Sequence, residues 1–281
     1  MKINWYPGHM AKTKRLIKEQ LKYIDVVYEL IDARIPYSSK LREIDSLLKG
    51  KKKILIFTKM DLCDEKETNK WIKYYEGKGY YIVALSLLSN QRIDDIIKLS
   101  KEILKDRDKD KIAKGLKISK IKALIIGIPN VGKSTLINKL VGKRAVNVGN
   151  RPGITKMNQW IRINDDIELL DTPGILWPRL DEEKVAFNLA SMTAIKEEIL
   201  PIDDVAIYIL KLLNKHYPNS LKERYGITNI DFDDIVSTYE QIGKRRGLLI
   251  KNGEIDYDRV SLIIINDLRD GYLGNVTFDR F

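Results

Sequence analysis

The sequence predicts an α/β protein with a mostly parallel sheet, followed by a region of helices alone. Three observations carry this prediction. β-Rich runs alternate with helical patterns over the first 105 residues, a buried apolar run at 123–126 opens into a glycine-rich turn and a helix, and only helical patterns follow residue 178. Strands that alternate with helices favour parallel pairing, with both faces of the sheet covered.

The first part of the chain starts with an aromatic turn at residues 5–9. A helix over 11–23 follows, with apolar residues on one side and lysines on the other. The later patterns predict strands at 26–31, 54–57 and 80–84 and helices at 39–48, 66–75 and 93–105. Residues 105–122 are charged and mostly polar and contain Gly115, so they predict a linker between an edge strand and the central one.

The second part begins with the strand and helix of residues 123–140, and then a loop at 146–158 without apolar periodicity. Short strands are expected at 160–163 and 167–170, on either side of a polar turn. Helical spacing appears at 182–200, 204–216, 233–244 and 256–270, with Asp leading several of these segments. We therefore expect two domains, an α/β domain at 1–180 and a helical one at 181–281.

Composition is that of a soluble protein with an ample core, because 44% of the 281 residues are hydrophobic and 32% are charged. No apolar run approaches the ~20 residues that cross a bilayer. The N-terminus lacks the pattern of a secretory or transit signal, so a cytoplasmic location without membrane contact is expected. The single cysteine, Cys63, cannot form an internal disulfide and is expected to be a small buried hydrophobe.

The formal net charge of +11 is unevenly distributed. Residues 1–60 hold 14 Lys and Arg against six Asp and Glu, whereas residues 181–281 hold 13 against 18. A polyanionic partner such as RNA is therefore expected to meet the first 180 residues. The alternative is a general lysine-rich usage in which these side chains only solvate helices.

The stretch at residues 123–140 reads ALIIGIPNVGKSTLINKL, which contains G-x-x-x-x-G-K-S between a strand and a helix. Glycines let backbone NH groups and the helix N-terminus face an anion, and Lys133 supplies a charge for the outer phosphates. The hydroxyl of Ser134 suits Mg²⁺. The expected loop contacts to a nucleoside triphosphate are Asn130, Val131, Gly132, Lys133, Ser134 and Thr135. A glycine-rich turn that binds nothing would leave the Gly-Lys-Ser combination unexplained.

A second phosphate motif, Asp171-Thr172-Pro173-Gly174, ends a strand about forty residues later. Asp171 can hold Mg²⁺ through water, and the NH group of Gly174 can meet the terminal phosphate. Between the two motifs, Thr155 is the natural hydroxyl to reach the metal. The expected magnesium set is therefore Ser134, Thr155 and Asp171.

The base is read by Thr58-Lys59-Met60-Asp61, which follows the apolar run at 54–57. The carboxylate of Asp61 can accept hydrogen bonds from the ring NH and the exocyclic amine of guanine, each worth ~1.5–3 kcal/mol because one partner is charged. Adenine would leave this carboxylate unpaired. Lys59 is expected to lie along the base plane. Without the phosphate motifs, an ordinary surface turn would explain the same residues.

These motifs resemble those of Ras-like GTPases, but the base-reading motif comes first, as in circularly permuted GTPases. Four segments sharpen the likeness: Trp5-Tyr6-Pro7-Gly8-His9-Met10, Asp32-Ala33-Arg34-Ile35-Pro36, residues 127–134, and Arg151-Pro152-Gly153-Ile154-Thr155. Together they are similar to the ribosome biogenesis GTPase A family. The resemblance implies a circularly permuted P-loop GTPase domain with an all-α C-terminal domain. It also implies GTP/GDP binding and action late in the assembly of the large ribosomal subunit, with ribosomal RNA as a partner.

The chain departs from the usual motifs in three places. Thr58 replaces an Asn that braces the base loop, and Ser86-Leu87-Leu88 stands in place of Ser-Ala-Lys, so that the backbone at Ser86 and Leu87 must make the base contact. Ile175 occupies the place of a glutamine that orients water. An isoleucine cannot hydrogen-bond water, so hydrolysis is expected to be slow in isolation.

The resemblance implies that the ribosomal particle stimulates hydrolysis and that His9 helps the water, although a histidine in this turn can equally cap the next helix. The catalytic set is then His9, Lys133, Thr155 and Gly174. Asn130 resembles a residue that binds K⁺ in related GTPases, which makes potassium a candidate cofactor. The protein is expected to be a monomer off the ribosome.

Two classes of function remain after these motifs: a ribosome-assembly GTPase, and a GTP-dependent RNA-binding or scaffolding protein whose hydrolysis is incidental. An ATP-dependent kinase or helicase conflicts with Asp61. Phosphate and shape contacts are the expected mode of RNA binding. The candidate basic groups are the N-terminal lysine face, Lys143 with Arg144 and Arg151, and Lys244 with Arg245 and Arg246, the last three being equally explained as favourable charges at a helix end.

Overall fold

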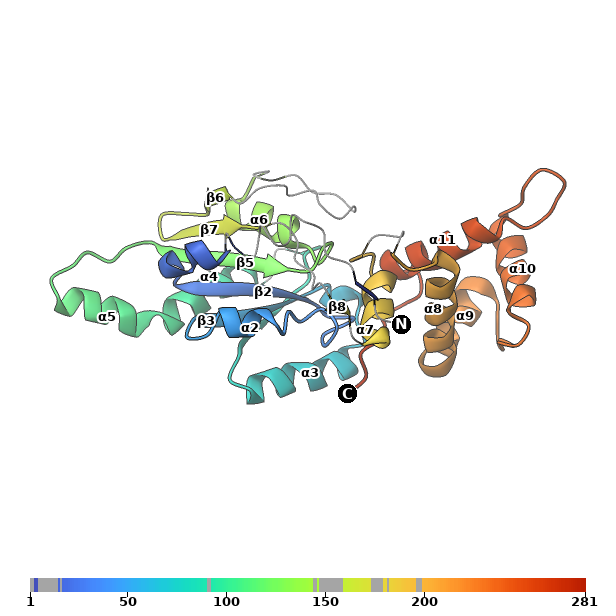
Figure 1. Cartoon of the computed structure of the whole chain (residues 1–281), viewed down its shortest axis with the longest axis horizontal. Helices are drawn as coiled ribbons and strands as arrows, with labels where there is room; N and C mark the ends of the chain where they lie inside the picture. Colours follow the sequence, from blue (N-terminus) through green and yellow to red (C-terminus); the bar gives the residue numbers. More distant parts are fainter. Residues whose placement is uncertain are drawn as a thin grey trace.

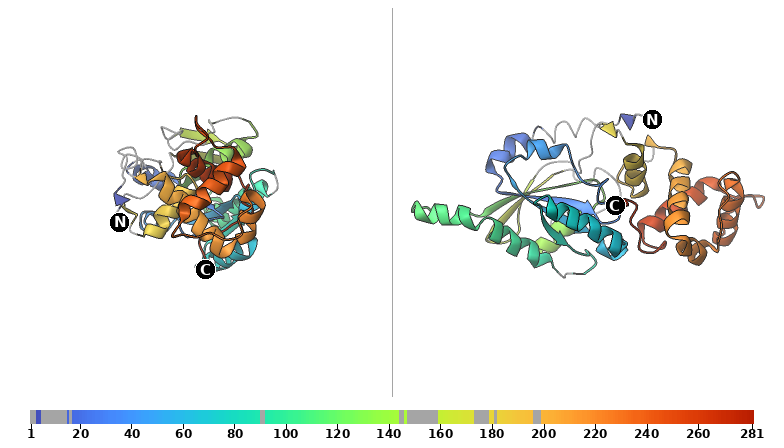
Figure 2. Two further views of the ribbon diagram at one scale, coloured as in Figure 1. Left: turned by 90° about the vertical axis from the view of Figure 1, so that its right-hand side faces the viewer. Right: turned by 90° about the horizontal axis from the view of Figure 1, so that it is seen from below.

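A computed structural model describes residues 3–4, 15, 17–89, 92–143, 146, 159–172, 179–180, 182–195 and 199–281. The α/β part and the C-terminal helices lie side by side along the long axis of the molecule (Figure 1). A view from below shows the same arrangement, with the helices beyond the carboxyl end of the sheet (Figure 2). None of the helices in these ranges combines the length and the apolar character that crossing a membrane requires.

Six strands form the main sheet in the order β4-β3-β2-β5-β7-β6. All neighbours pair in parallel except β6, which is antiparallel to β7. The strands are β2 Val26–Asp32, β3 Lys52–Thr58, β4 Tyr81–Ala84, β5 Ile121–Gly127, β6 Gln159–Arg162 and β7 Ile167–Asp171. The central strands are buried on both faces, which explains their continuous apolar runs and confirms the expected α/β class.

The two faces of the sheet are covered by different helices. On one face, Tyr28 of β2 shares a hydrogen bond of 2.7 Å with Ser100 of α4 (Ile93–Ile103), and α6 (Lys133–Val141) packs beside α4. On the other face, the rings of Phe57 and Tyr75 lie 6.3 Å apart, which places α3 (Glu65–Gly77) there. Cys63 is buried under α3, and burial raises the pKa of its thiol to about 11, so it acts as the expected small hydrophobe.

The chain runs from the edge strand β4 to the central strand β5, as the permuted order predicts. The segment between them, however, is not the linker without secondary structure that we expected. Its residues Lys105–Ala113 form helix α5, which projects from the body of the molecule (Figures 1 and 2). Asp106 lies in its first turn and Lys111 in its last, where each complements the helix dipole. The helix has no buried residue, so it lacks the apolar stripe by which a helix is recognised in a sequence.

Two expected helices are shorter in the structure. The helix expected at 39–48 is reduced to α2, Ile44–Leu47, because the backbone before it forms turns, in which the NH of Lys40 donates to the carbonyl of Tyr37 and the NH of Arg42 to that of Lys40. The helix expected at 182–200 ends early, as α7 Glu183–Ser191, and the chain turns at Thr193, which has a φ of 55°. The segment 11–23 is described only at residue 15 and from residue 17, and it ends in the 3-10 turn η1, Leu21–Tyr23.

The other C-terminal helices match their predicted positions to within two residues, and one helix was not predicted. That helix, α9, begins with a proline in its first turn and ends at Gly226 in the left-handed conformation. The set is α8 Ile202–His216, α9 Pro218–Tyr225, α10 Ile235–Arg246 and α11 Tyr257–Arg269.

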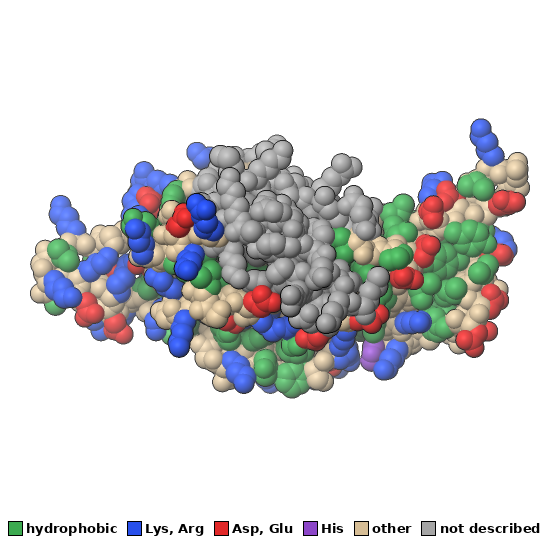
Figure 3. Space-filling model, viewed as in Figure 1, with side chains coloured by type: hydrophobic (Ala, Val, Ile, Leu, Met, Phe, Trp, Pro, Cys, Tyr) green, Lys and Arg blue, Asp and Glu red, His purple; other side chains and the backbone are tan. Residues whose placement is uncertain are grey.

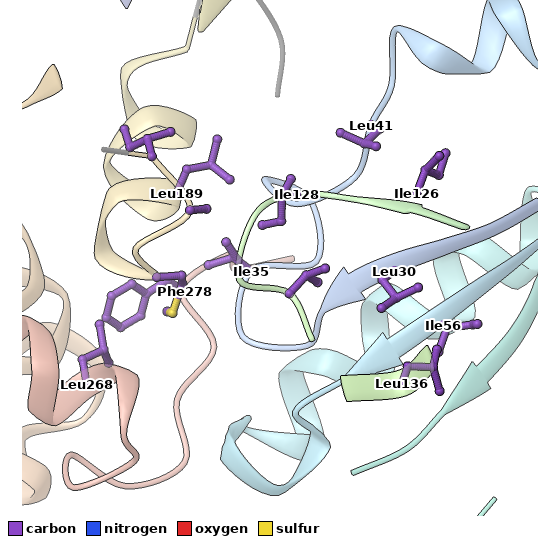
Figure 4. Packing of buried hydrophobic residues seen from close by; sticks show 14 of the residues in the cluster. Leu30, Ile35, Leu41, Ile56, Ile126, Ile128, Leu136, Leu189, Leu268 and Phe278 are labelled. Carbon is purple, nitrogen blue, oxygen red and sulfur yellow. The ribbon is translucent and has the colours of Figure 1, made fainter. Parts of the chain in front are cut away.

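One hydrophobic core runs through both parts of the chain. Ile35 of the α/β part lies near Leu189, Leu268 and Phe278 at the junction (Figure 4). The C-terminal residues 276–278 pack against the α/β part, where the NH of Phe278 donates to the carbonyl of Arg34 over 2.7 Å. The two parts are therefore packed together rather than joined by a loose linker.

Candidate functional site

The phosphate loop leaves β5 at Gly127 and enters α6 at Lys133, as the sequence predicts. Gly132 has a φ of 101°, a conformation that glycine adopts without strain. A Cβ atom on Gly132 would also lie 2.7 Å from Cδ1 of Leu87, so a side chain there would push the end of Leu87 aside. The backbone can therefore curl closely at the N-terminus of α6, which is the end of a helix that attracts anions.

Lys133 meets the second phosphate motif in the folded chain. Its Nζ lies 2.6 Å from Oδ1 of Asp171, and both side chains are buried. Asp171 ends β7, which pairs with β5 in the sheet, so the two phosphate motifs emerge from neighbouring strands. Burial lowers the pKa of Lys133, against the opposing attraction of Asp171.

The second oxygen of Asp171 is the observation that bears on a metal. Oδ2 is buried and has no hydrogen-bond partner within the described part of the chain. A buried carboxylate oxygen without a donor is costly, and a metal-bound water would satisfy it. Ser134, half-buried at the start of α6, offers a hydroxyl at the same edge. These two residues fit Mg²⁺, whereas Thr155, Gly174 and Ile175 lie outside the described residues.

The base motif is tied to the phosphate loop through Thr58. This buried side chain donates from Oγ1 to the carbonyl of Val131 over 2.7 Å, with the carbonyl of Ile31 at 3.2 Å as a second acceptor. The brace that an Asn usually supplies is thus made here by a hydroxyl. Asp61, the expected base reader, is half-buried in the 3-10 turn η2 (Met60–Leu62) that follows.

The loop after β4 closes the same edge of the sheet. The NH of Leu85 donates to the carbonyl of Phe57 over 2.9 Å, which places residues 85–87 beside the base motif. Ser86 is half-buried, and its Oγ accepts a hydrogen bond from the NH of Leu88. Leu87 reaches across to Gly132, as described above. The structure therefore brings residues 58–61, 85–87 and 130–134 together.

Lys59 makes an ion pair that the sequence did not predict. Its backbone is left-handed, with a φ of 59°, and its Nζ lies 2.8 Å from Oδ2 of Asp32 at the end of β2. The ammonium group of Lys59 is thus engaged with a carboxylate. Only the methylene chain of Lys59 is then available for the expected contact along the plane of a base. Burial lowers the pKa of Lys59, and Asp32 counters part of that effect.

Asp32 and Arg34 form a buried pair that links the base motif to the C-terminal helices. The guanidinium of Arg34 donates to both carboxylate oxygens of Asp32 over 3.0 Å and also reaches the carbonyls of Leu268 and Arg269 over 3.3 and 3.2 Å. Burial alone would raise the pKa of Asp32, but Arg34 and Lys59 outweigh it and hold that pKa below its ordinary value. The carbonyls belong to the end of α11, where a cation is favourable.

Asn130 makes a second link between the site and the helices. Its Nδ2 donates to the carbonyl of Thr193 over 2.6 Å, just after α7. Both residues have positive φ angles, 59° and 55°. The phosphate loop is therefore in direct contact with the segment that leaves α7.

The expected RNA-binding residues are only partly placed. Lys244 pairs with Glu240 over 3.0 Å, and Arg245 and Arg246 complete the last turn of α10 before Gly247. This arrangement agrees with the explanation of favourable charges at a helix end. Lys143 is exposed. His9, Arg144 and Arg151 lie outside the described residues.

Comparison with known proteins gives consistent matches. Residues 122–245 match the family model described as 50S ribosome-binding GTPase. Ribosome biogenesis GTPase A of Bacillus cereus is 46% identical over 279 residues, covering 99% of this chain and 94% of that protein. The protein of the same name in Thermotoga maritima is 33% identical over 278 residues, with the same two coverages.

Two solved structures also match along almost the whole chain. The structure of GNP-bound YlqF from T. maritima has a TM-score of 0.67 and 28% identity, covering 96% of this chain and 98% of that one. The GDP-bound structure of the T. maritima protein has a TM-score of 0.66 and 27% identity, with coverages of 95% and 99%. Because relatives that are 33% and 46% identical cover almost the whole chain and the solved structure shares its fold, the chain belongs to the ribosome biogenesis GTPase A family.

Proposed function

We propose that the protein binds GTP at the carboxyl edge of its sheet, acts on a large ribosomal subunit precursor, and hydrolyses GTP to drive or check a late assembly step. The observation that carries the proposal is the joining of four motifs at one edge through three contacts: Thr58 on Val131, Leu87 over Gly132, and Lys133 on Asp171. We place the activity in the cytoplasm, with a monomeric protein off the ribosome.

Each residue at this edge has a chemical task in the proposal. Asp61 accepts hydrogen bonds from guanine, with backbone groups at Ser86 and Leu87 beside the base. Lys133 turns from Asp171 to the outer phosphates, and the NH groups of 131–135 surround them. Ser134, Thr155 and Asp171 would hold Mg²⁺, which when bound offsets charge on the phosphate oxygens. The NH of Gly174 meets the terminal phosphate.

The weak point of the isolated protein is the orientation of water, because Ile175 has no polar atom in its side chain. We propose that the ribosomal particle completes the site and that His9 takes part. The short strand β1 (Ile3–Asn4) pairs with β8 (Arg179–Leu180), which follows Ile175 by four positions. This pairing supports the proposal only by holding the N-terminal end of the chain against the strand that follows Ile175.

A His9→Ala variant separates the two roles left open for this residue. If His9 helps the water, the variant loses most of the particle-stimulated hydrolysis, by about 10²-fold or more, while its melting temperature stays unchanged. If His9 only caps a helix, the variant loses stability by about 1 kcal/mol and keeps its stimulation.

The helices are proposed to report the nucleotide state. In this view residues 1–180 form the GTPase domain and residues 181–281 form the domain that responds to it. The chain after Gly174 leads directly into α7, and the contacts of Asn130 with Thr193 and of Arg34 with α11 join the nucleotide loops to the helices. A terminal phosphate that orders the loops can therefore bias the helical domain.

The test is the affinity for purified large-subunit precursors, measured by co-sedimentation with a non-hydrolysable GTP analogue and with GDP. The proposal predicts tighter binding with the analogue and release with GDP. Equal affinity in the two states would refute the switch.

Potassium is a narrower part of the proposal. Asn130 lies in the phosphate loop, and an amide oxygen is a group that suits a monovalent cation. Replacing Na⁺ with K⁺ in a GTPase assay should raise the rate, and an unchanged rate would remove potassium from the account.

A second function is supported by Ile175, because an isoleucine cannot orient the attacking water. In it the protein is a GTP-dependent RNA-binding or scaffolding factor, and hydrolysis is incidental. Particle binding without any stimulation of hydrolysis favours this second function.

A further inference from the structure

Two exposed aromatic rings and two lysines from three separate segments form one row on the surface of the α/β part. Lys22 Nζ lies 4.8 Å from the ring centre of Tyr23, Lys122 Nζ lies 5.6 Å from the same ring, and Lys122 Nζ lies 5.3 Å from the ring centre of Trp160. The row therefore alternates cation, ring, cation and ring, and is called here the aromatic–basic row. Its members come from η1, β5 and β6.

The rings are open to solvent. Tyr23 is 49% exposed, and Trp160, which stands on the edge strand β6, is 41% exposed. Exposed aromatic faces that lie beside lysines offer stacking surfaces next to positive charge. The contacts with lysine cover only part of each ring.

The lysines of the row make no ion pair within the described residues, since neither Lys22 nor Lys122 has a carboxylate there within ion-pair distance. The two acidic residues beside Lys122 are engaged elsewhere, since Asp25 pairs with Arg107 over 2.7 Å and Glu168 pairs with Lys120 over 3.2 Å. The row thus presents positive charge next to bare ring faces.

The surface around the aromatic–basic row also carries mostly positive charge. On the face shown in Figure 3, Lys and Arg side chains dominate the end of the molecule that carries α5, whereas Asp and Glu gather around the C-terminal helices. A polyanion is therefore attracted to the α/β end before any specific contact forms.

We propose that the aromatic–basic row binds unpaired nucleotides of RNA, with bases stacked on Trp160 and Tyr23 and phosphates at Lys122 and Lys22. Base stacking on aromatic rings combined with a cationic track is the chemistry of single-strand binding. The bases of a duplex are already stacked on each other and cannot use the rings. The inference rests on the proposed function, since ribosomal RNA is the polyanion that this function brings to the protein.

The test uses the full-length protein and two fluorescein-labelled probes of equal length, a single-stranded oligouridylate, whose bases are largely unstacked, and an RNA duplex, in an anisotropy assay over a range of salt. The single strand should bind more tightly than the duplex. Trp160→Ala should weaken single-strand binding by about five- to 100-fold, whereas Trp160→Phe, which keeps a ring, should retain most of it.

The matched control is Tyr272→Ala. Tyr272 is 61% exposed and lies under the guanidinium of Arg224 at 4.5 Å, so it offers the same kind of pair on the acidic half of the molecule. Its loss should leave both affinities unchanged. Lys122→Gln should lower the slope of log affinity against log salt by about 0.7, and Lys251→Gln, which removes a charge in the C-terminal half, should not.

Equal losses in Trp160→Ala and Tyr272→Ala, no loss in either, or a duplex affinity that falls as much as the single-strand affinity would overturn the proposal. Circular dichroism checks the fold, and if Trp160→Ala does not fold, Tyr23→Ala against Tyr23→Phe applies the same test to the other ring. The assay contains no ribosome, so a negative result would not contradict the proposed binding to the ribosomal particle. If particle binding fails instead, the RNA affinities measured in this assay can still be interpreted.

Discussion

Asp61 carries the base selectivity of the proposed site because its carboxylate is the group that matches two donors on guanine. Replacing it by Asn keeps the shape but presents an NH₂ group to the exocyclic amine. Xanthine, which has a carbonyl at that position, matches the amide instead. We expect Asp61→Asn to weaken GDP binding at least tenfold, through the loss of one charged hydrogen bond of ~1.5–3 kcal/mol, and to improve XDP binding.

Competition of GDP and XDP for a fluorescent nucleotide measures this change. Asp110→Asn, on the exposed helix α5, is the control and should behave as wild type. An Asp61→Asn protein that still prefers GDP by the original margin would show that the base is read elsewhere.

Asp32 gives the site a defined response to pH. Its pKa is lowered in the folded protein by Arg34 and Lys59 despite its burial, so the native state binds the proton less readily than the unfolded chain does. The stability contributed by Asp32 is therefore fully present above the ordinary Asp pKa of about 4, and it is lost as pH falls below that value toward the lower folded pKa.

The Asp32→Asn variant tests this linkage. Removing one partner of a buried pair should lower the free energy of unfolding by ~3–5 kcal/mol at neutral pH. The difference between wild type and variant, measured by urea unfolding, should then shrink as the pH falls below about 4. A difference that stays constant with pH would contradict the assigned role.

At the scale of the elements, the hydroxyl of Thr58 joins the end of β3 to the loop between β5 and α6. Thr58→Val keeps the shape and removes the donor, which leaves the carbonyl of Val131 unsatisfied. We expect a loss of ~1–3 kcal/mol in the free energy of unfolding and faster release of GDP. Thr58→Ser retains the hydroxyl and should restore both quantities, and a serine variant no better than the valine one would place the effect in packing.

The elements also show what sequence reasoning can and cannot reach. The strands β2, β3 and β5 were predictable because a strand that is buried on both faces needs consecutive apolar residues, and such runs are visible in the sequence. Helix α5 was not, since a helix that buries nothing leaves no periodic pattern, only the favourable propensities of its charged residues.

Some features of the site were also predictable from the sequence, and others were not. The placement of Gly132, Lys133 and Asp171 at one edge of the sheet was predictable from their motifs, whereas the ion pair between Lys133 and Asp171 was not predicted. The bonds of Lys59 to Asp32 and of Arg34 to α11 join segments up to 235 positions apart, so only the folded chain brings them together. The motif Asp32-Ala33-Arg34 was the available signal, and its buried pair now has a physical role.

At the scale of the whole molecule, the nucleotide edge and the C-terminal helices are continuous. The core has no break at their junction, where Ile35 and Leu268 belong to one cluster, and Arg34 and Asn130 add polar contacts across it. Such a junction can transmit a change at the phosphate loop because packed interfaces rearrange as units rather than deform gradually.

The aromatic–basic row lies on the α/β part, while the helices that follow the switch form the other end of the molecule. Contact with RNA at the first end and nucleotide-dependent placement of the second would let one protein sense whether a particle is correctly formed. This arrangement fits a GTPase that is slow alone and completes its site on a partner.

The most direct test of this account is the single-turnover rate of GTP hydrolysis, measured with and without purified large ribosomal subunits. The account predicts a slow rate for the isolated protein and a strong increase on addition of the particle. A rate that the particle leaves unchanged, at concentrations where co-sedimentation shows binding, would contradict the account and favour the scaffolding function.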